Sequence, residues 1–251
     1  MAQGKGIFLV RNLSSIKKWA AAQWPCGLGR GALDSYVISR YIDNPLLVCG
    51  KKFDIRMYVL VTTFRPLKAW ISDLAFCRFC TEPYEKGDLE NSFVHLTNVA
   101  IQKHGDAYND KHGSKWPLSC LRIFLEGTYG REVSDRLFHT IRLVVLHSLR
   151  AVQKNIINDK HCFELYGYDM LVDDALKPWL LEVNASPSLT VTTEADRKLK
   201  QQVIWDTLAV AVPPDFLYGR RRGSASEAAP QRVGSLRLLV DEEVSMRIQP
   251  L

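Results

Sequence analysis

The 251-residue sequence contains no apolar run long enough to cross a membrane and no recognisable secretory leader. A membrane-spanning helix needs about 20 consecutive apolar residues. A leader needs a charged start, a long apolar run and a cleavage site, and the opening MAQGKGIFLV supplies none of these. We therefore expect a protein without a membrane span that resides in the cytoplasm.

Cysteine is also sparse. The six cysteines show neither the density nor the regular spacing of a disulfide framework, which argues against a small secreted scaffold. Cys77 and Cys80 form a CxxC pair, but a zinc site needs a second pair of ligands at suitable spacing, so we interpret this pair as structural. The sequence lacks a helix-turn-helix signature, zinc-finger spacing and an aromatic-glycine RNA-binding motif, and these absences argue against nucleic acid as the partner.

The sequence does contain enough apolar material for a folded domain, together with an excess of positive charge. With 47% hydrophobic and 24% charged residues, the 28.5 kDa chain can bury one core or divide into two small lobes. The net charge of +6 and the pI near 9.0 predict attraction to an acidic partner. Charge alone leaves open an acidic protein tail, a nucleic acid or an anionic lipid.

Local patterns predict a mixture of helices and strands in the first half of the chain. A helix is expected from Ser14 or Ser15 to Gln23, because either serine can cap it. SYVISRY (residues 35–41) has the composition of a strand. Residues 80–116 form a long polar connection that is functional or mobile, in which FVHLTNVAI is a possible short strand.

Two long β-type runs follow each other in the middle of the sequence. Phe53–Thr63 and Lys68–Phe79 are separated by a tight connection at Arg65-Pro66, which predicts an antiparallel pair. Apolar residues then recur at helical spacing over Leu118–Glu126 and Val133–Ile156. These patterns predict an α+β fold with a mostly antiparallel sheet and packed helices.

A hairpin near the C-terminal end carries three oxygen-bearing side chains among apolar residues. If residues 174–177 form its turn, then 173 pairs with 178, 171 with 180, and 169 with 182. Asp169, Glu182 and Asn184 then share one face, with the two acids directly opposed, about 5 Å apart at Cβ. Opposed carboxylates need a cation between them, and two carboxylates with an amide suit magnesium. The alternative is a solvated hairpin face with incidental acids.

The first long β-type run carries three charged residues on one face. Lys52, Asp54 and Arg56 alternate with apolar neighbours, which is typical of a half-buried strand. They form either a site or a ladder of surface salt bridges. Two glycine-rich segments, QGKGI at residues 3–7 and CGLGRG at 26–31, match no complete phosphate-binding motif and are weak signals alone.

Five long motifs together resemble the tubulin tyrosine ligase-like family, over residues 3 to about 213. They are QGKGIF, KKFDIRMYVLV, FCRFC, FVHLTNVAIQKHG and GYDMLVDDALKPWLLEVNASPSL. The similarity is strongest to the short polyglutamylase branch and implies an ATP-grasp fold, in which two α+β lobes grip ATP. It implies an ATP-grasp domain over residues 1–213, with central and C-terminal lobes but no N-terminal lobe. From its composition, the segment 214–251 is expected to be a weakly ordered tail.

Carried over position by position, the resemblance implies roles for individual residues. Asp169, Glu182 and Asn184 would be the magnesium ligands, and Arg78 and Lys115 would hold the carboxylates of the amino-acid donor. Lys52 and Arg56 would stabilise charge during the reaction. The residues around ATP would be Gln3, Gly4, Ser39, Arg40, Tyr41, Ile42, Lys52, Asp54, Thr97 and Asn98.

The reaction implied by the resemblance is the ATP-dependent addition of free L-glutamate to glutamate side chains of tubulin C-terminal tails. An acyl phosphate forms first, and an isopeptide bond follows, with ATP and Mg²⁺ required. Accessory subunits and a location at the cytoskeleton, in a cilium basal body or flagellar axoneme, belong to the same expectation. The alternatives are an inactive truncated module that binds microtubules or a partner, a ligase of the same fold that uses glycine or tyrosine, and a nucleic-acid-binding module supported only by charge. His95 is expected to be a structural, hydrogen-bonded residue rather than a general base.

Overall fold

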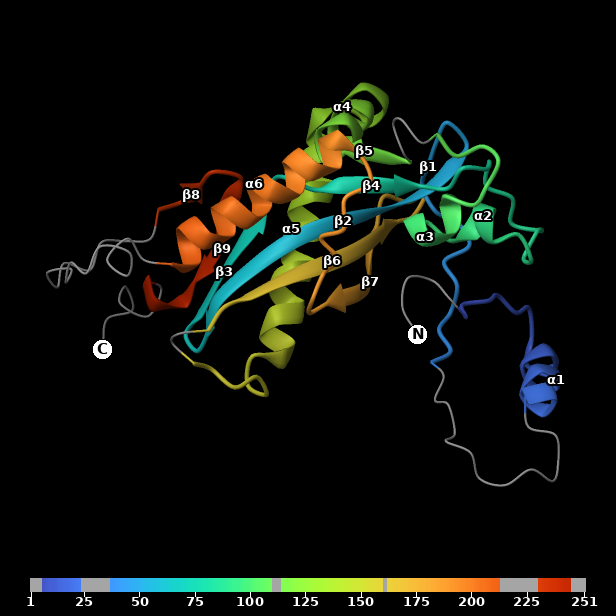
Figure 1. Ribbon diagram of the computed structural model, residues 1–251, viewed down its shortest axis with the longest axis horizontal. Coiled ribbons are helices and arrows are strands. Elements are labelled where there is room, and N and C mark those ends of the chain that lie inside the picture. Colours follow the sequence, from blue (N-terminus) through green and yellow to red (C-terminus); the bar gives the residue numbers. More distant parts are fainter. Residues whose placement is uncertain (1–5, 24–36, 110–113, 160–161, 213–229, 245–251) are drawn as a thin grey trace, which may run out of the picture.

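A strand of 14 residues, β2 (Lys51–Phe64), organises the fold. In the computed structural model, which describes residues 6–23, 37–109, 114–159, 162–212 and 230–244, β2 pairs with other strands along both edges (Figure 1). One edge pairs with β3 (Leu67–Ser72) and β4 (Phe76–Phe79), and the other with β6 (Glu164–Val172), next to β7 (Pro178–Asn184). These pairings are antiparallel, which confirms the predicted α+β architecture.

Four further strands complete the described sheet. β1 (Leu47–Val48) pairs with β2, and β5 (Lys115–Pro117) pairs with β4. Beyond β3 lie β9 (Leu236–Asp241) and then β8 (Arg232–Val233). The sheet therefore extends from β5 through β4, β2, β3 and β9 to β8, with β6 and β7 on the other edge of β2.

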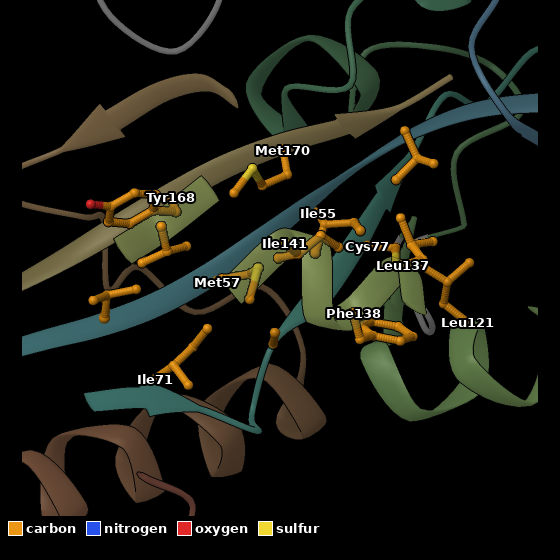
Figure 2. Close-up of a cluster of buried hydrophobic side chains, with 14 of the residues drawn as sticks. Ile55, Met57, Ile71, Cys77, Leu121, Leu137, Phe138, Ile141, Tyr168 and Met170 are labelled. Carbon is orange, nitrogen blue, oxygen red and sulfur yellow. The ribbon is translucent and has the colours of Figure 1, made fainter. Parts of the chain in front are cut away.

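The two faces of β2 have different partners because successive side chains point to opposite sides of a strand. On one face, Ile55 and Met57 pack with the helices α4 (Leu118–Tyr129) and α5 (Arg131–Val152), as Figure 2 shows. On the other face, Tyr58 packs against α6 (Glu194–Ala211), which lies in front of the sheet in Figure 1, while α5 passes behind it. Lys52, Asp54 and Arg56 alternate with the core residues and so belong to the α6 face.

The predicted antiparallel pair and the helices are confirmed, with adjusted boundaries. The connection at Arg65-Pro66 contains a cis peptide bond. The second run, expected to be one strand over Lys68–Phe79, is interrupted at residues 73–75, so it forms β3 and β4. The N-terminal helix α1 (Leu13–Gln23) forms where the sequence predicts it.

Two segments predicted as strands have other structures. The expected strand SYVISRY is not formed: residues 37–43 have no strand structure, because no described strand lies beside them. Val37 is accordingly 95% exposed. FVHLTNVAI instead forms two helical turns, α2 (Ser92–His95) and α3 (Val99–Gln102). The Asn91 side chain caps the first turn, and the Gln102 amide binds the carbonyl groups of Phe93 and Leu96, so local hydrogen bonds favour turns there.

Residues 232–241 differ from the expectation of a weakly ordered tail. Leu236 is fully buried, and β9 pairs with β3 at the edge of the sheet. Asp206 of α6 accepts hydrogen bonds from the backbone N and Oγ of Ser235, at 2.8 and 2.6 Å. A short apolar-rich run, SLRLLVD, forms this strand, although the average composition of the region is polar.

Candidate active site

The carboxylate hairpin has the predicted opposition of its two acids. Asp169 pairs with Glu182 and Gly167 with Asn184 across β6 and β7, and the Asn184 amide donates to Glu182 Oε1 at 3.0 Å. Nearer the turn the predicted register is wrong by one residue: Met170, rather than residue 171, faces Leu180. A register shift directly after Asp169 absorbs the difference without moving the two acids apart.

Asp169 is neutralised by two arginines. Arg56 Nε and Nη2 bind Asp169 Oδ1 and Oδ2 at 2.5 and 2.9 Å, and Arg78 Nη2 lies 2.9 Å from Oδ2. Burial alone would raise the pKa of Asp169, but the Arg56 hydrogen bonds and the Arg78 charge outweigh it and hold the pKa below its usual value. Burial and the neighbouring Asp169 raise the pKa of Glu182, as expected for crowded carboxylates.

Arg56, Asp169 and Glu182 form a first charged row across β2, β6 and β7, and a second charged row crosses β2, β4 and β5 beside it. Asp54 pairs in register with Arg78, and Arg78 with Lys115. Arg78 Nε donates to Asp54 Oδ1 at 2.7 Å and its Nη2 to Oδ2, where Thr97 Oγ1 also donates at 2.7 Å. Asp54 is 3% and Arg56 8% exposed, so these charges are not the surface ladder that was the alternative interpretation.

Lys52 lies in an aromatic corner next to these rows. Its Nζ donates to Tyr41 Oη at 3.0 Å and to the His95 carbonyl at 2.9 Å. The His95 ring lies 2.8 Å from Tyr41 Oη through Nδ1 and 2.7 Å from the Asp88 carbonyl through Nε2. Burial lowers the pKa of both Lys52 and His95. Both ring nitrogens of His95 therefore have hydrogen-bond partners, which supports the prediction of a structural residue.

Two residues near Lys115 were not identified from the sequence. Lys115 Nζ donates to Asp196 Oδ2 at 2.9 Å, and Lys200 Nζ donates to the same oxygen at 3.0 Å. Both Asp196 and Lys200 are 5% exposed and lie one turn apart on α6, facing the sheet. Their only signal in the sequence is an acid and a lysine at i and i+4 on the side of the helix that also carries Val203.

The remaining residues predicted to surround ATP are only partly brought together. Gln3 and Gly4 lie outside the described residues. Ser39 and Arg40 are exposed, Ile42 is partly buried, and Asn98 begins α3. A cleft of about 400 Å³ is lined by Tyr41, Leu9, Val10 and Leu89, among others, but its lining does not include Lys52 or Arg56.

The side-chain oxygens of the hairpin are of the type that a hard divalent cation prefers as ligands. Asp169, Glu182 and Asn184 offer carboxylate and amide oxygens. The repulsion from Asp169 that helps to raise the pKa of Glu182 would be relieved by a bound cation. Within the described ranges, no three histidine, cysteine, aspartate or glutamate side chains come together as a metal cluster. The hairpin supplies two such acids, and the third oxygen comes from an amide.

Comparison with known proteins identifies relatives over most of the chain. Residues 1–217 match the tubulin-tyrosine ligase family. The "Probable alpha-tubulin polyglutamylase Ttll1" of Tetrahymena thermophila is 46% identical over 98% of this chain. The "Probable tubulin polyglutamylase ttll-9" of Caenorhabditis elegans is 47% identical over 81% of this chain, and the "Probable tubulin polyglutamylase TTLL9" of Bos taurus is 41% identical over 88%.

The match covers only part of these relatives. The aligned region spans 60%, 48% and 54% of the length of the three proteins, respectively. No helix in the described part of the chain has the length and apolar character needed to cross a membrane.

Proposed function

Because the chain belongs to the tubulin-tyrosine ligase family, whose ATP-grasp-like α+β fold it shares, we propose that it is an ATP-dependent ligase that joins free L-glutamate to glutamate side chains of tubulin C-terminal tails. Relatives that are 41–47% identical carry the name tubulin polyglutamylase, which supports glutamate as the donor and tubulin as the acceptor. The predicted alternatives, an inactive binding module and a glycine ligase, have no comparable support.

The charge balance of the α6 face carries this proposal. Within the described part of the chain, four buried cations and the partly buried Lys115 lie around the two charged rows and the aromatic corner, beside Asp54, Asp169, Asp196 and the more exposed Glu182. The other buried acid of α6, Asp206, lies apart from them and binds Ser235. A buried charge is costly unless it is paired, so five cations beside four carboxylates favour anionic ligands. Phosphates and amino-acid carboxylates are such ligands, and the ligase reaction uses both.

The proposed reaction has two steps. The side-chain carboxylate of the acceptor glutamate attacks the terminal phosphorus of ATP, which forms an acyl phosphate and releases ADP. The amine of free glutamate then attacks the acyl carbon and loses a proton, and phosphate leaves as the isopeptide bond forms.

Residues of the two rows and the aromatic corner serve this reaction. Lys52, held by Tyr41 and His95, would bind the phosphate oxygens of ATP. Arg56 binds Asp169 through Nε and Nη2, and its Nη1, which has no hydrogen bond to a described residue, would stabilise the tetrahedral intermediate. Asp169, Glu182 and Asn184 would hold a magnesium ion, which would neutralise phosphoryl charge.

The site for the amino-acid donor is proposed at the β5 end of the second charged row, Asp54–Arg78–Lys115, which we call the donor row. Arg78 and Lys115 face each other on paired strands, so both cations project on one face. Free glutamate has two carboxylates, and one cation for each would favour it over glycine. Because Arg78 already binds Asp54 with Nε and Nη2, the donor would be met by its Nη1, for which the described residues show no hydrogen bond.

Labelled amino acids test the proposed activity. We expect ATP-dependent incorporation of labelled glutamate into microtubules, and little incorporation of labelled glycine or tyrosine. Incorporation of glycine instead would overturn the donor assignment. Microtubule binding without incorporation of any of the three would favour the non-catalytic binding module.

Binding to microtubules is expected to depend on charge. Tubulin tails are acidic, and a chain of net charge +6 should meet them through screened electrostatic attraction. Affinity measured by co-sedimentation should fall as salt rises, and should fall again when the tails are removed by protease. Equal affinity for intact and tail-free microtubules would contradict this electrostatic account.

A tubulin substrate also implies the place of action. We propose that the protein acts at the cytoskeleton, in a cilium basal body or flagellar axoneme, and works with accessory subunits. Antibody detection of the tagged protein along axonemes tests the location.

A further inference from the structure

Asp196 joins three parts of the molecule through one carboxylate oxygen. Its Oδ2 accepts from Lys115 Nζ on β5 at 2.9 Å, from Lys200 Nζ on α6 at 3.0 Å, and from the Thr192 backbone N at 3.1 Å. Thr192 belongs to the segment that leads from the carboxylate hairpin to α6. The carboxylate is therefore a junction between the donor row, the helix and the segment after β7.

Local structure fixes the position of this carboxylate before any ligand binds. The Thr193 side chain caps α6 by accepting from the Asp196 backbone N at 3.2 Å, so Asp196 lies in the first turn of the helix. The Lys200 ammonium also donates to the Thr190 carbonyl, which ties the preceding segment to the same helix face. Asp196 is 5% exposed and has little freedom to move.

Lys115 needs such an anchor because of its neighbour. It lies directly opposite Arg78 in the register of β4 and β5, and two like charges in that position repel each other. Arg78 is restrained by Asp54 and Asp169, and Lys115 by Asp196. With Lys200 on the same oxygen, two ammonium groups share one negative charge, and the excess favours an anionic ligand beside Lys115.

We propose that Asp196 is a positioning residue of the donor site, which holds Lys115 beside Arg78 so that the two cations can meet the carboxylates of the amino-acid donor. The proposal rests on the proposed ligase function, because that function supplies the donor. Asp196 acts through Lys115 and does not itself need to touch the donor.

Asp196→Asn tests the proposal with little change in shape. The variant removes the negative charge between the two lysines and leaves Lys115 with neutral partners such as Thr192 Oγ1, at 3.0 Å, so Lys115 should be held less firmly in its position. We expect the dissociation constant of labelled glutamate, measured by equilibrium binding with a non-hydrolysable ATP analogue, to rise about tenfold or more. Binding of a fluorescent ATP analogue should change little, because Lys52 and the aromatic corner do not contact Asp196.

Asp206→Asn is the matched control. Asp206 is a second buried acid on α6, but it binds Ser235 and Gln202 near β8 and β9. Its substitution should lower the thermal unfolding temperature and leave glutamate binding unchanged. If both variants weaken glutamate binding equally, the effect comes from general loss of structure and the proposal is wrong.

A double-mutant cycle shows whether Asp196 acts through Lys115. If it does, Lys115→Met combined with Asp196→Asn should bind glutamate no more weakly than Lys115→Met alone. Additive losses would overturn the proposal. Wild-type protein that binds glutamate but transfers none would refute the proposed ligase reaction and leave the positioning role standing, whereas protein that binds no glutamate would refute both.

Discussion

Glu182→Gln is expected to abolish turnover, a loss on the order of 100-fold or more. The substitution keeps the shape and the contact with Asn184 but removes one of the two opposed charges of the hairpin. A magnesium ion would then have a single charged protein ligand, Asp169, whose own charge is already shared with Arg56 and Arg78. Incorporation of labelled glutamate measures the loss.

The control for this prediction comes from the same hairpin. Asp174 is exposed in the turn, so Asp174→Asn removes the same charge away from the site and should leave turnover unchanged. Because the Glu182 side chain is still partly exposed and the substitution keeps its contact with Asn184, the unfolding midpoint should also stay close to that of the wild type. Undiminished glutamylation by Glu182→Gln would refute the metal assignment.

Arg78→Ala should lower the free energy of unfolding by about 3–5 kcal/mol, because it leaves two buried carboxylates without their common partner. Asp54 would keep Thr97 as a donor, and Asp169 would keep Arg56. Neither donor replaces the charge-assisted contacts that Arg78 makes with both acids. Urea denaturation, followed by circular dichroism, measures the change.

Two further variants separate the contribution of Arg78 to protein stability from its role in binding glutamate. Arg197→Ala removes an exposed arginine that pairs with Glu194 on α6, and it should leave the unfolding free energy nearly unchanged. Arg78→Lys retains a charge and should be more stable than Arg78→Ala, while it raises the KM for glutamate far more than the KM for ATP. An unfolding free energy of Arg78→Ala equal to that of the wild type would show that the buried network does not hold the sheet together.

Sequence patterns predict those parts of the fold that depend on near neighbours. The opposition of Asp169 and Glu182 was predicted from an assumed turn and the alternation of side chains, and it holds because the register shift after Asp169 offsets a turn assignment that was wrong by one residue. The register shift next to Asp169 escaped the count, because a bulge leaves no mark in the residue pattern. The antiparallel pairing of β2 with β3 was equally accessible, since its connection is short.

Long-range partners account for what the sequence did not predict. Lys115 and Asp196 are 81 positions apart, and nothing near either residue in the chain indicates the other. The resemblance assigned Arg78 to the donor, but its contacts with Asp54 and Asp169 emerge only when three strands pair. The strand β9 was hidden by the polar composition around it, and its pairing partner β3 lies more than 160 positions earlier.

The late position of β9 has a consequence for how the chain acquires its fold. Its pairing with β3 joins Ser72 to Leu236 and Lys68 to Asp241, which gives the sheet contacts of very high sequence separation. Such contacts form slowly, because a long loop must close first. During synthesis, β3 therefore remains an open edge until β9 has left the ribosome, and Trp70 lacks its cover of Leu236 for that time. We therefore expect the chain to be most exposed to aggregation at this stage of its synthesis.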